Sequence, residues 1–528
     1  MTYTVIDAYR DSLTPSVAEP RAGDDVNPTG VRQYDAEPVN EAKKPKLFKG
    51  REPIYPRRVS GFFRRLKWWI MGLTLTIYYV TPWLRWNRGP YAPDQAVLID
   101  MPARRFYFFW IEIWPQEFFY VAGLLIMAGL GLFLVTSAVG RAWCGYACPQ
   151  TVWTDLFIWI ERFVEGDRNA RIKLDQQPWT ADKIAKKVTV HATWLLIALA
   201  TGGAWIFYFA DAPTLLGQFL RGDAAPIAYT TVAILTFTTY VFGGLMREQV
   251  CTYMCPWPRV QAAMMDKHSL TVTYNDWRGE PRSRHQKRAI KDGLDVGDCV
   301  DCNACVAVCP TGIDIRNGQQ LPCITCALCI DACDEVMEKV GKPKGLISYT
   351  TLEHYKENEV RAAEIGRVDA TRQQILPGWR DVLRPRTALY FVLWSGIGLG
   401  MVYAVTMRDR LDVNVLHDRN PQFVQLSSGD VRNGYTLKIL NMTPQPRDFD
   451  VGLIGLPGAA MWTPDSALEP ARRFTVSAEP DSVRELRVFV QADPDGLGTA
   501  SEPFSFEVFE IGGRESAAVE TRFAGPNP

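Results

Sequence analysis

This 528-residue chain lacks a net charge, and it lacks any isolated cysteine. Its 58 Lys and Arg residues balance 58 Asp and Glu residues, which excludes a bulk electrostatic attraction to nucleic acid. All twelve cysteines fall into four short groups between Cys144 and Cys333, so the chain beyond Cys333 has none and can form no disulfide there. The spacing within the four groups is therefore the first clue to the chemistry.

Two of the groups are long runs with the spacing of bacterial ferredoxins. They read Cys299-x2-Cys302-x2-Cys305-x3-Cys309-Pro310 and Cys323-x2-Cys326-x2-Cys329-x3-Cys333. In such runs the first three thiolates hold one 4Fe-4S cluster and the fourth holds the other cluster. The alternative, a pair of zinc ribbons, also uses Cys-x2-Cys but does not need three cysteines and then a fourth. We therefore predict two 4Fe-4S clusters, one on Cys299, Cys302, Cys305 and Cys333 and the other on Cys323, Cys326, Cys329 and Cys309.

Long apolar segments indicate a membrane protein. A membrane-spanning helix needs about 20 apolar residues, and five segments approach or reach that length: Trp68–Leu84, Phe118–Val139, Val188–Ala210, Ile227–Met246 and Ala388–Met407. The first is flanked by arginines and tryptophans, which is typical of an anchored span rather than a cleaved signal. The fold prediction is a multi-domain membrane protein with five transmembrane α-helices.

The distribution of Lys and Arg predicts the orientation of these spans. Ten basic residues lie between Lys43 and Lys67 and eight between Arg141 and Lys187, whereas Asp211–Pro226 holds only Arg221. The positive-inside rule then places the N-terminus in the cytoplasm and the C-terminus outside. The loop Arg85–Glu117, which this orientation places outside, carries four arginines and so agrees less well with the rule. The ferredoxin module, inserted between the fourth and fifth spans, is predicted to be cytoplasmic.

Beyond the fifth span the hydrophobic period changes to two. Tyr435, Leu437 and Ile439 alternate with polar residues, and similar runs follow around Val488 and Phe506, separated by turn sequences. This pattern predicts a β-sandwich of roughly 100 residues. His417 is its only histidine, and the sequence shows no group of catalytic residues there. The predicted domains are a disordered cytoplasmic arm (1–50), transmembrane helices one to four (51–260), the ferredoxin module (261–386), the fifth helix (387–407) and the exported sandwich (408–528).

The two short groups are Cys144-x3-Cys148-Pro149 and Cys251-x3-Cys255-Pro256. They follow the second and fourth spans, so both are predicted at the cytoplasmic boundary. On a helix, thiols four residues apart share a face, and the following Pro ends or kinks that helix. Copper binding, a dithiol redox relay, a contribution to a quinol site and an additional cluster all remain open. Simple packing as buried small residues is the structural alternative. Between the motifs, Thr151 to Val164 predicts an amphipathic interfacial helix.

The stretch Gly140-Arg141-Ala142-Trp143-Cys144-Gly145-Tyr146-Ala147-Cys148-Pro149-Gln150-Thr151-Val152-Trp153 resembles a membrane signature of the CcoG/FixG/RdxA family. Similar resemblances are seen in the segment Arg247 to Trp257 and in Cys309-Pro310-Thr311-Gly312-Ile313-Asp314-Ile315-Arg316-Asn317-Gly318. The resemblance covers residues from about 45 to the end, with an exported immunoglobulin-like β-sandwich. Family members also show the acidic residue that follows Cys333 here, Asp334.

The resemblance implies an inner-membrane accessory protein that reduces Cu(II) to Cu(I) for assembly of the cbb-type cytochrome c oxidase. It would place copper near Cys144, Cys148, Cys251 and Cys255, which become the candidate catalytic residues. Expected partners are the membrane, oxidase-assembly and copper-delivery proteins, a quinol or cytoplasmic electron donor, and a second copy of the chain as a homodimer; nucleic acid is not expected. A quinol-oxidising electron-transfer subunit and a redox sensor are the alternative functions.

Overall fold

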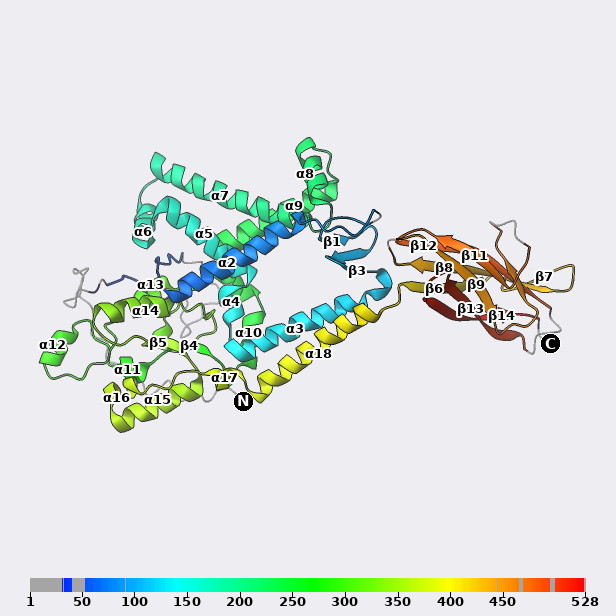
Figure 1. Cartoon of the computed structure of the whole chain (residues 1–528). Coiled ribbons are helices and arrows are strands. Elements are labelled where there is room, and N and C mark those ends of the chain that lie inside the picture. The colour runs from blue at the N-terminus through cyan, green and yellow to red at the C-terminus, as the bar shows by residue number, and fades with distance from the viewer. Residues whose placement is uncertain are drawn as a thin grey trace. The chain divides into compact units, whose positions relative to one another are not determined.

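The computed structural model describes residues 31, 33–39, 53–90, 92–443, 445–464, 469–493 and 499–526. The chain forms two compact units (Figure 1). The first unit comprises Met1–Pro82, Ile99–Arg104 and Trp114–Leu399, and it contains all twelve cysteines. The second comprises Trp83–Leu98, Arg105–Ile113 and Gly400–Pro528.

The first unit is mainly helical. Its longer helices are α2 (Phe62–Val80), α3 (Phe119–Val139), α5 (Pro149–Glu165), α7 (Ala181–Ile206), α9 (Pro226–Thr239), α15 (Leu352–Ile365) and α18 (Pro385–Met407). Its shorter helices are α4 (Ala142–Tyr146), α6 (Arg168–Gln176), α8 (Ala212–Arg221), α10 (Trp257–Met264), α11 (Asp276–Gly279), α12 (Gln286–Lys291), α13 (Ala304–Val308), α14 (Leu328–Lys339), α16 (Arg367–Arg372) and α17 (Trp379–Val382). The π-helical segments are η3 (Tyr240–Met246) and η4 (Val250–Met254), and the 3-10 segments are η1 (Thr81–Trp83), η2 (Pro115–Glu117) and η5 (Ile315–Asn317).

Four helices among the described residues are long and apolar enough to cross a membrane. They are Pro115–Val139, Ala181–Ile206, Pro226–Met246 and Pro385–Met407, and they match four of the five predicted spans. The fifth predicted span corresponds to α2, which has 19 residues and begins with Arg64, Arg65 and Lys67. The number of spans is thus confirmed as about four, and the fifth stays a prediction.

Helices α3 and α18 run side by side (Figure 1). Ser137 Oγ and Thr387 Oγ1 lie 3.0 Å apart, and Trp394 Nε1 donates to the Met127 carbonyl at 3.1 Å. A Cβ on Gly131 would lie 3.3 Å from Trp394 Nε1. Small and hydroxylated residues therefore let these helices approach closely, as is typical of helix pairs in membranes.

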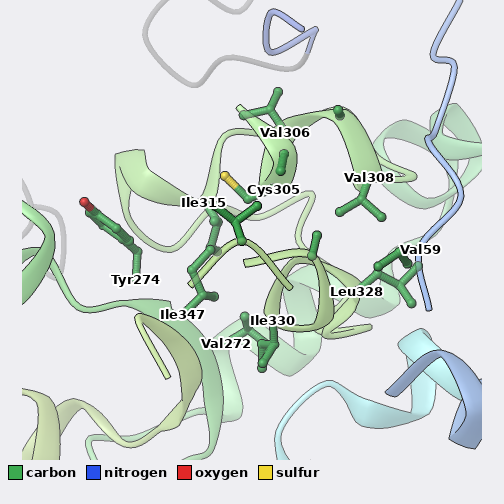
Figure 2. Packing of buried hydrophobic residues seen from close by; sticks show 14 of the residues in the cluster. Val59, Val272, Tyr274, Cys305, Val306, Val308, Ile315, Leu328, Ile330 and Ile347 are labelled. Atoms are coloured by element: carbon green, nitrogen blue, oxygen red, sulfur yellow. The ribbon is translucent and has the colours of Figure 1, made fainter. Parts of the chain in front are cut away.

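The ferredoxin loops fold around their own apolar core. The two-stranded antiparallel sheet of β4 (Thr271–Tyr274) and β5 (Ile347–Thr350) contributes Val272, Tyr274 and Ile347 to it. Figure 2 shows these side chains gathered with Cys305, Val306, Val308, Ile315, Leu328 and Ile330. The cysteine loops are thereby held between helices α13 and α14 and the sheet.

The N-terminal segment corrects part of the disordered-arm prediction. Residues 33–39 are extended against the ferredoxin module: Tyr34 N donates to the Cys302 carbonyl at 3.1 Å, and Val39 N donates to the Gly312 carbonyl at 2.8 Å. Val31 is also buried. Pairing of backbone groups with the module explains why this polar stretch is ordered. The remaining residues of the predicted arm lie outside the described part of the chain.

The second unit contains a two-sheet sandwich, which confirms the β-sandwich prediction. Tyr435, Leu437 and Ile439 all point into its core and are fully buried. One sheet has the order β10-β12-β8-β6 with β7 beside β8, and the other has the order β11-β9-β13-β14. The strands are β6 (Leu411–His417), β7 (Val424–Gln425), β8 (Val431–Asn441), β9 (Arg447–Ile454), β10 (Ala460–Trp462), β11 (Arg473–Ala478), β12 (Ser482–Ala492), β13 (Ser501–Glu510) and β14 (Ser516–Ala524).

A small sheet occupies the connection that the sequence suggested was a loop. It consists of β1 (Val97–Asp100), β2 (Arg105–Phe108) and β3 (Ile111–Ile113). The Arg88 guanidinium donates to four backbone carbonyls of this region, at 2.6 to 2.8 Å. Arg85 also pairs with Asp94 at 2.7 Å. Arg105 pairs with Glu112 at 3.4 Å, so three of the four arginines in this connection are structural.

The sandwich core offers a direct stability test. Phe506 is fully buried on β13, whereas its neighbour Ser505 points to the opposite face of the strand and is part-exposed. We expect Phe506→Ala to lower the free energy of unfolding of this domain by about 3–5 kcal/mol through the cavity it leaves. Pulse proteolysis of the full chain in urea measures this. Ser505→Ala is the matched control, and an equal loss in both variants would contradict the assigned strand register.

Candidate functional site

The two long cysteine runs adopt the same backbone conformation. Helices α13 and α14 begin after Asn303 (φ 58°, ψ 15°) and Ala327 (φ 59°, ψ 12°), each the residue after the second cysteine of its run. Asp301 and Thr325, two positions earlier, also have positive φ. Left-handed backbone at four residues that are not glycine is unfavourable and persists only where the surroundings impose it. The runs are thus two copies of one cysteine-presenting loop.

The electrostatic contacts among the thiols cross between the runs. Burial raises the pKa of the Cys333 thiol, and its next largest influences are Cys305, Cys299 and Cys302 of the other run. Burial likewise raises the pKa of Cys323 to about 12, with Cys326 and then Cys309 among the thiols that add to the shift. Each run therefore sends its fourth cysteine toward the first three of its partner. This is the arrangement that crossed ligation requires, although the assignment of ligands to iron stays a prediction.

The surroundings of these thiols fit 4Fe-4S clusters. A cavity next to the second run is lined by Cys305, Cys309, Cys323, Cys326 and Cys329. Its remaining lining is largely apolar and includes Val272, Ile313, Ile324 and Leu328. No three His, Cys, Asp or Glu side chains in the described ranges converge closely enough to hold a single metal ion. Cysteines spread around a cavity suit a cluster better than one ion, because each thiolate binds a different iron.

One buried cation stands beside the first group of thiols. The Arg316 guanidinium donates to Asp301 and Asp314, both at 2.7 Å, and to Asn303 Oδ1 at 2.8 Å. Burial raises the pKa of the Cys305 thiol. The second largest effect comes from Arg316, whose positive charge lowers that pKa. The guanidinium favours the thiolate form of Cys305, while the two carboxylates that hold it, Asp301 and Asp314, oppose this effect on the neighbouring thiols.

The first short motif packs directly on the second ferredoxin loop. A Cβ on Gly145 would lie 2.7 Å from the Ile324 carbonyl oxygen and 3.1 Å from Cys326 N, so only glycine fits there. Tyr146 Oη donates to the Cys326 carbonyl at 3.2 Å, and Tyr349 Oη donates to the Thr325 carbonyl at 2.6 Å. The backbone between Cys144 and Cys148 is thereby in contact with a predicted cluster ligand.

The two short motifs also meet each other. Cys144 Sγ donates to Gln261 Oε1 at 3.1 Å, and Gln261 belongs to α10, which follows the second motif. Burial, and after it the charges of Cys148, Cys144 and Cys255, raises the pKa of Cys251 to about 12. The four thiols that the sequence singled out therefore lie near enough to influence one another electrostatically, although no three of them converge on a single metal position.

The helical geometry expected for these motifs is wrong in detail. Cys144 lies on α4, but Cys148 is extended (φ −59°, ψ 128°) and precedes α5. Cys251 lies on the π-helical segment η4, and Cys255 is extended at its end. The residue before a proline is driven out of the helical region, so each Cys-Pro pair breaks its helix. The two motifs therefore approach each other through these breaks rather than along one helix face.

Two residues that position Cys144 were missed by reading the sequence. Gln261 is fully buried, and its Nε2 donates to Thr136 Oγ1 of α3 at 3.2 Å while its Oε1 accepts from Cys144. A lone glutamine and threonine carry no spacing signal, so only the fold reveals them. The predicted interfacial helix is present as α5, but it buries Asp155, Glu161 and Glu165 in addition to apolar residues.

Parts of the chain match three known domain families. Residues 246–352 match a 4Fe-4S dicluster domain, and residues 121–166 match a 4Fe-4S binding domain. Residues 401–526 match an IG-like fold at the C-terminus of FixG, described as a putative oxidoreductase. The first match includes Cys251 and Cys255 besides the two long runs, and the second includes Cys144 and Cys148.

Three curated relatives are similar over most of their length. "Nitrogen fixation protein FixG" of Rhizobium meliloti is 59% identical over 94% of this chain and 97% of its own. "Protein RdxB" and "Protein RdxA" of Cereibacter sphaeroides are 55% and 50% identical, over 86% and 91% of this chain and 91% and 98% of their own. Together with the cysteine loops and the apolar helices, these matches indicate a membrane protein with iron–sulfur clusters that transfers electrons. The chain belongs to the FixG/RdxA family.

Proposed function

We propose that this iron–sulfur protein reduces Cu(II) to Cu(I) at the four thiols of the short motifs, for assembly of the copper centre of a cbb-type cytochrome c oxidase. The observation that carries the proposal is the contact of Gly145 and Tyr146 with the loop of Cys326. It joins soft, copper-compatible thiols to a candidate cluster site within one folded unit.

The chain's residues divide the task between holding clusters and holding copper. Cys299, Cys302, Cys305 and Cys333 would hold one cluster and Cys323, Cys326, Cys329 and Cys309 the other, which when bound supply the one-electron carriers that the reduction needs. Cys144, Cys148, Cys251 and Cys255 would bind the substrate copper and favour its soft Cu(I) state. Because burial raises the pKa of Cys144 to about 11 and of Cys251 to about 12, both are thiols at neutral pH. Copper binding would therefore release protons.

The proposed setting is a bacterial inner membrane with the N-terminus and the ferredoxin module in the cytoplasm. Basic residues near the start of α2 and the start of α7 support this orientation. The arginines of the connection between α2 and α3 weigh against it less than their number suggests, because Arg85 and Arg88 are bound within that connection. The immunoglobulin-like domain would then be periplasmic, where oxidase-assembly or copper-delivery proteins could meet it.

The deciding experiment mixes chemically reduced, cluster-replete protein with Cu(II) and a Cu(I)-specific chelator. Re-oxidation of the clusters, seen as a change in visible absorbance, should accompany formation of the Cu(I) complex in equal electron equivalents. Re-oxidation without Cu(I) would contradict copper reduction. Reduction of the oxidised protein by a quinol would favour the quinol-oxidising alternative, and a redox state that alters only partner binding would favour a sensor.

Removal of the membrane thiols tests their role. Cys144→Ser and Cys251→Ser should each lower the Cu(I) formation rate by at least tenfold, because a hydroxyl is a poor ligand for soft Cu(I). Both cluster spectra should stay intact. The chelator assay and electron paramagnetic resonance of the reduced protein measure the two properties. Loss of an iron–sulfur signal in these variants would instead assign the short motifs to an additional cluster.

Displacement of the first motif tests the contact with the ferredoxin loop. In Gly145→Ala the new methyl group meets the Ile324 carbonyl, so the motif must shift away from Cys326. We expect Cu(I) formation to slow by roughly 10- to 100-fold, the effect of a displacement of about 1 Å in a reacting assembly. The cluster content should not change. Stopped-flow absorbance of cluster re-oxidation by Cu(II) gives the rate.

The matched control is Gly203→Ala on α7, where no atom lies within 4 Å of the added methyl group. That variant should behave as the parent protein does. Equal rates in Gly145→Ala and the parent protein would show that electrons do not need this contact.

A further inference from the structure

A basic cavity opens at the start of α2, apart from the thiol groups. Its volume is about 760 Å³. It lies between the first turns of α2 and the later turns of α5, and no acidic side chain lines it. The lining combines four arginines with three aromatic residues: Arg58, Arg64, Arg65, Arg162, Trp68, Trp159 and Phe163, together with Val59, Ser60 and Gly61.

The positive charge of this cavity is only partly neutralised. Arg64 pairs with the buried Asp155 at 2.8 Å. Lys67 lies 3.9 Å from the same carboxylate, so two cations share one negative charge. Arg58 and Arg65 are exposed, and neither forms an ion pair with the acidic residues of the described ranges. The cavity therefore carries an excess of guanidinium groups.

Arg162 contributes a further guanidinium, which is only loosely paired. Its Nη2 donates to the Pro56 carbonyl at 3.0 Å, and its Nε lies 3.9 Å from the Asp167 carboxylate, buried and without a hydrogen-bond partner among the described residues. Burial, and after it the neighbouring Arg64, lowers the pKa of Arg162 to about 10 although Asp155 and Asp167 raise it. A bound anion would offset both effects and supply an acceptor for the unpartnered N–H group.

Aromatic rings line the cavity beside the arginines, and a separate face of α2 is apolar. Trp68 and Trp159 stand edge to face at 6.1 Å, and Trp159 stacks on Phe163 at 6.0 Å. One face of α2 exposes large apolar side chains at intervals of three and four residues along most of the helix, which makes a continuous stripe. The stripe consists of Phe62, Leu66, Trp69, Leu73 and Ile77.

The cavity is fixed next to the ferredoxin module. The Asp331 carboxylate on α14 accepts hydrogen bonds from Phe63 N at 3.2 Å and Arg64 N at 2.7 Å, which satisfies the first N–H groups of α2. The arginines therefore lie at the end of α2 that faces the module, and the apolar stripe leads away from it. Charge at one end and an apolar stripe beyond it match a membrane interface.

We propose that this cavity binds the phosphate headgroup of an anionic phospholipid, with the acyl chains against the exposed rings of Trp159 and Phe163. Arginine clusters at a membrane interface recognise anionic lipid phosphates, and Trp residues suit the region between headgroups and chains. A neutral quinone headgroup would leave the arginines uncompensated. A free phosphate would leave the Trp159 and Phe163 rings exposed. The bound lipid would hold α2 and α5 at the membrane surface beneath the module, whether or not the protein reduces copper.

Native mass spectrometry of the full chain tests this, with phosphatidylglycerol and phosphatidylcholine of matched chains as probes in detergent. Phosphatidylglycerol should be retained and phosphatidylcholine should not. The double variant Arg58→Gln, Arg65→Gln should lower phosphatidylglycerol affinity by roughly 30-fold, as expected for two surface arginines. Millimolar inorganic phosphate should not displace the lipid.

The matched control is Arg288→Gln with Arg372→Gln, two exposed arginines of the same unit far in sequence from the cavity. It should retain the parent affinity, and Arg58→Lys with Arg65→Lys should retain most of it. Visible absorbance of the clusters verifies that each variant is folded. Equal loss in the control pair, equal retention of phosphatidylcholine, or displacement by inorganic phosphate would each overturn the proposal.

Discussion

The close contact between Gly145 and the backbone around Cys326 is the constraint on which the rest of the functional architecture depends. It requires glycine at the centre of the first short motif, and it requires the second ferredoxin loop to present its backbone rather than a side chain. The left-handed conformations of Thr325 and Ala327 provide that presentation. A backbone-to-backbone contact is also rigid, because no rotamer can relax it. The first short motif and the second ferredoxin loop are therefore held in direct contact.

Buried ion pairs hold the helices around this contact. Asp155 of α5 pairs with Arg64 of α2, and Glu161 of α5 pairs with Arg171 at 2.6 Å and with Arg247. Such pairs contribute little net stability over apolar packing, but removal of one partner costs about 3–5 kcal/mol. Their main effect is specificity, because a misplaced helix would leave a charge unpaired. Helix α5 is thus fixed to α2, α6 and the segment before the second motif.

Much of this organisation was predictable because iron–sulfur ligation and membrane insertion both leave patterns in the sequence. The spacing from Cys299 to Cys333 indicated the loops, and four hydrophobic runs gave helices close to the expected bounds. What was missed depends on contacts between distant segments. Gln261 and Thr136 have no periodic neighbours that mark them, and the π-helical turns η3 and η4 look like ordinary helix in sequence. The sheet β1–β3 was missed because its strands have only three or four residues, too few for a recognisable period; the adjoining backbone carbonyls are bound by Arg88, which precedes the sheet.

The second short motif shows how the ion pairs and the thiols are connected. Arg247, four residues before Cys251, has a positive φ of 44°, which is unfavourable by about 1–3 kcal/mol for a residue other than glycine. Its guanidinium pairs with Glu161, donates to the Gly244 carbonyl at 2.7 Å and lies over the Trp194 ring. The Gln150 amide, just after the first motif, donates to the Arg247 carbonyl at 3.1 Å and the Phe242 carbonyl at 2.7 Å. The strained turn is therefore stabilised from both sides, and it directs the chain so that Cys251 and Cys255 reach the thiols of the first motif. In this respect the buried charges of α5 act on the chemistry through backbone geometry rather than by contact with the thiols.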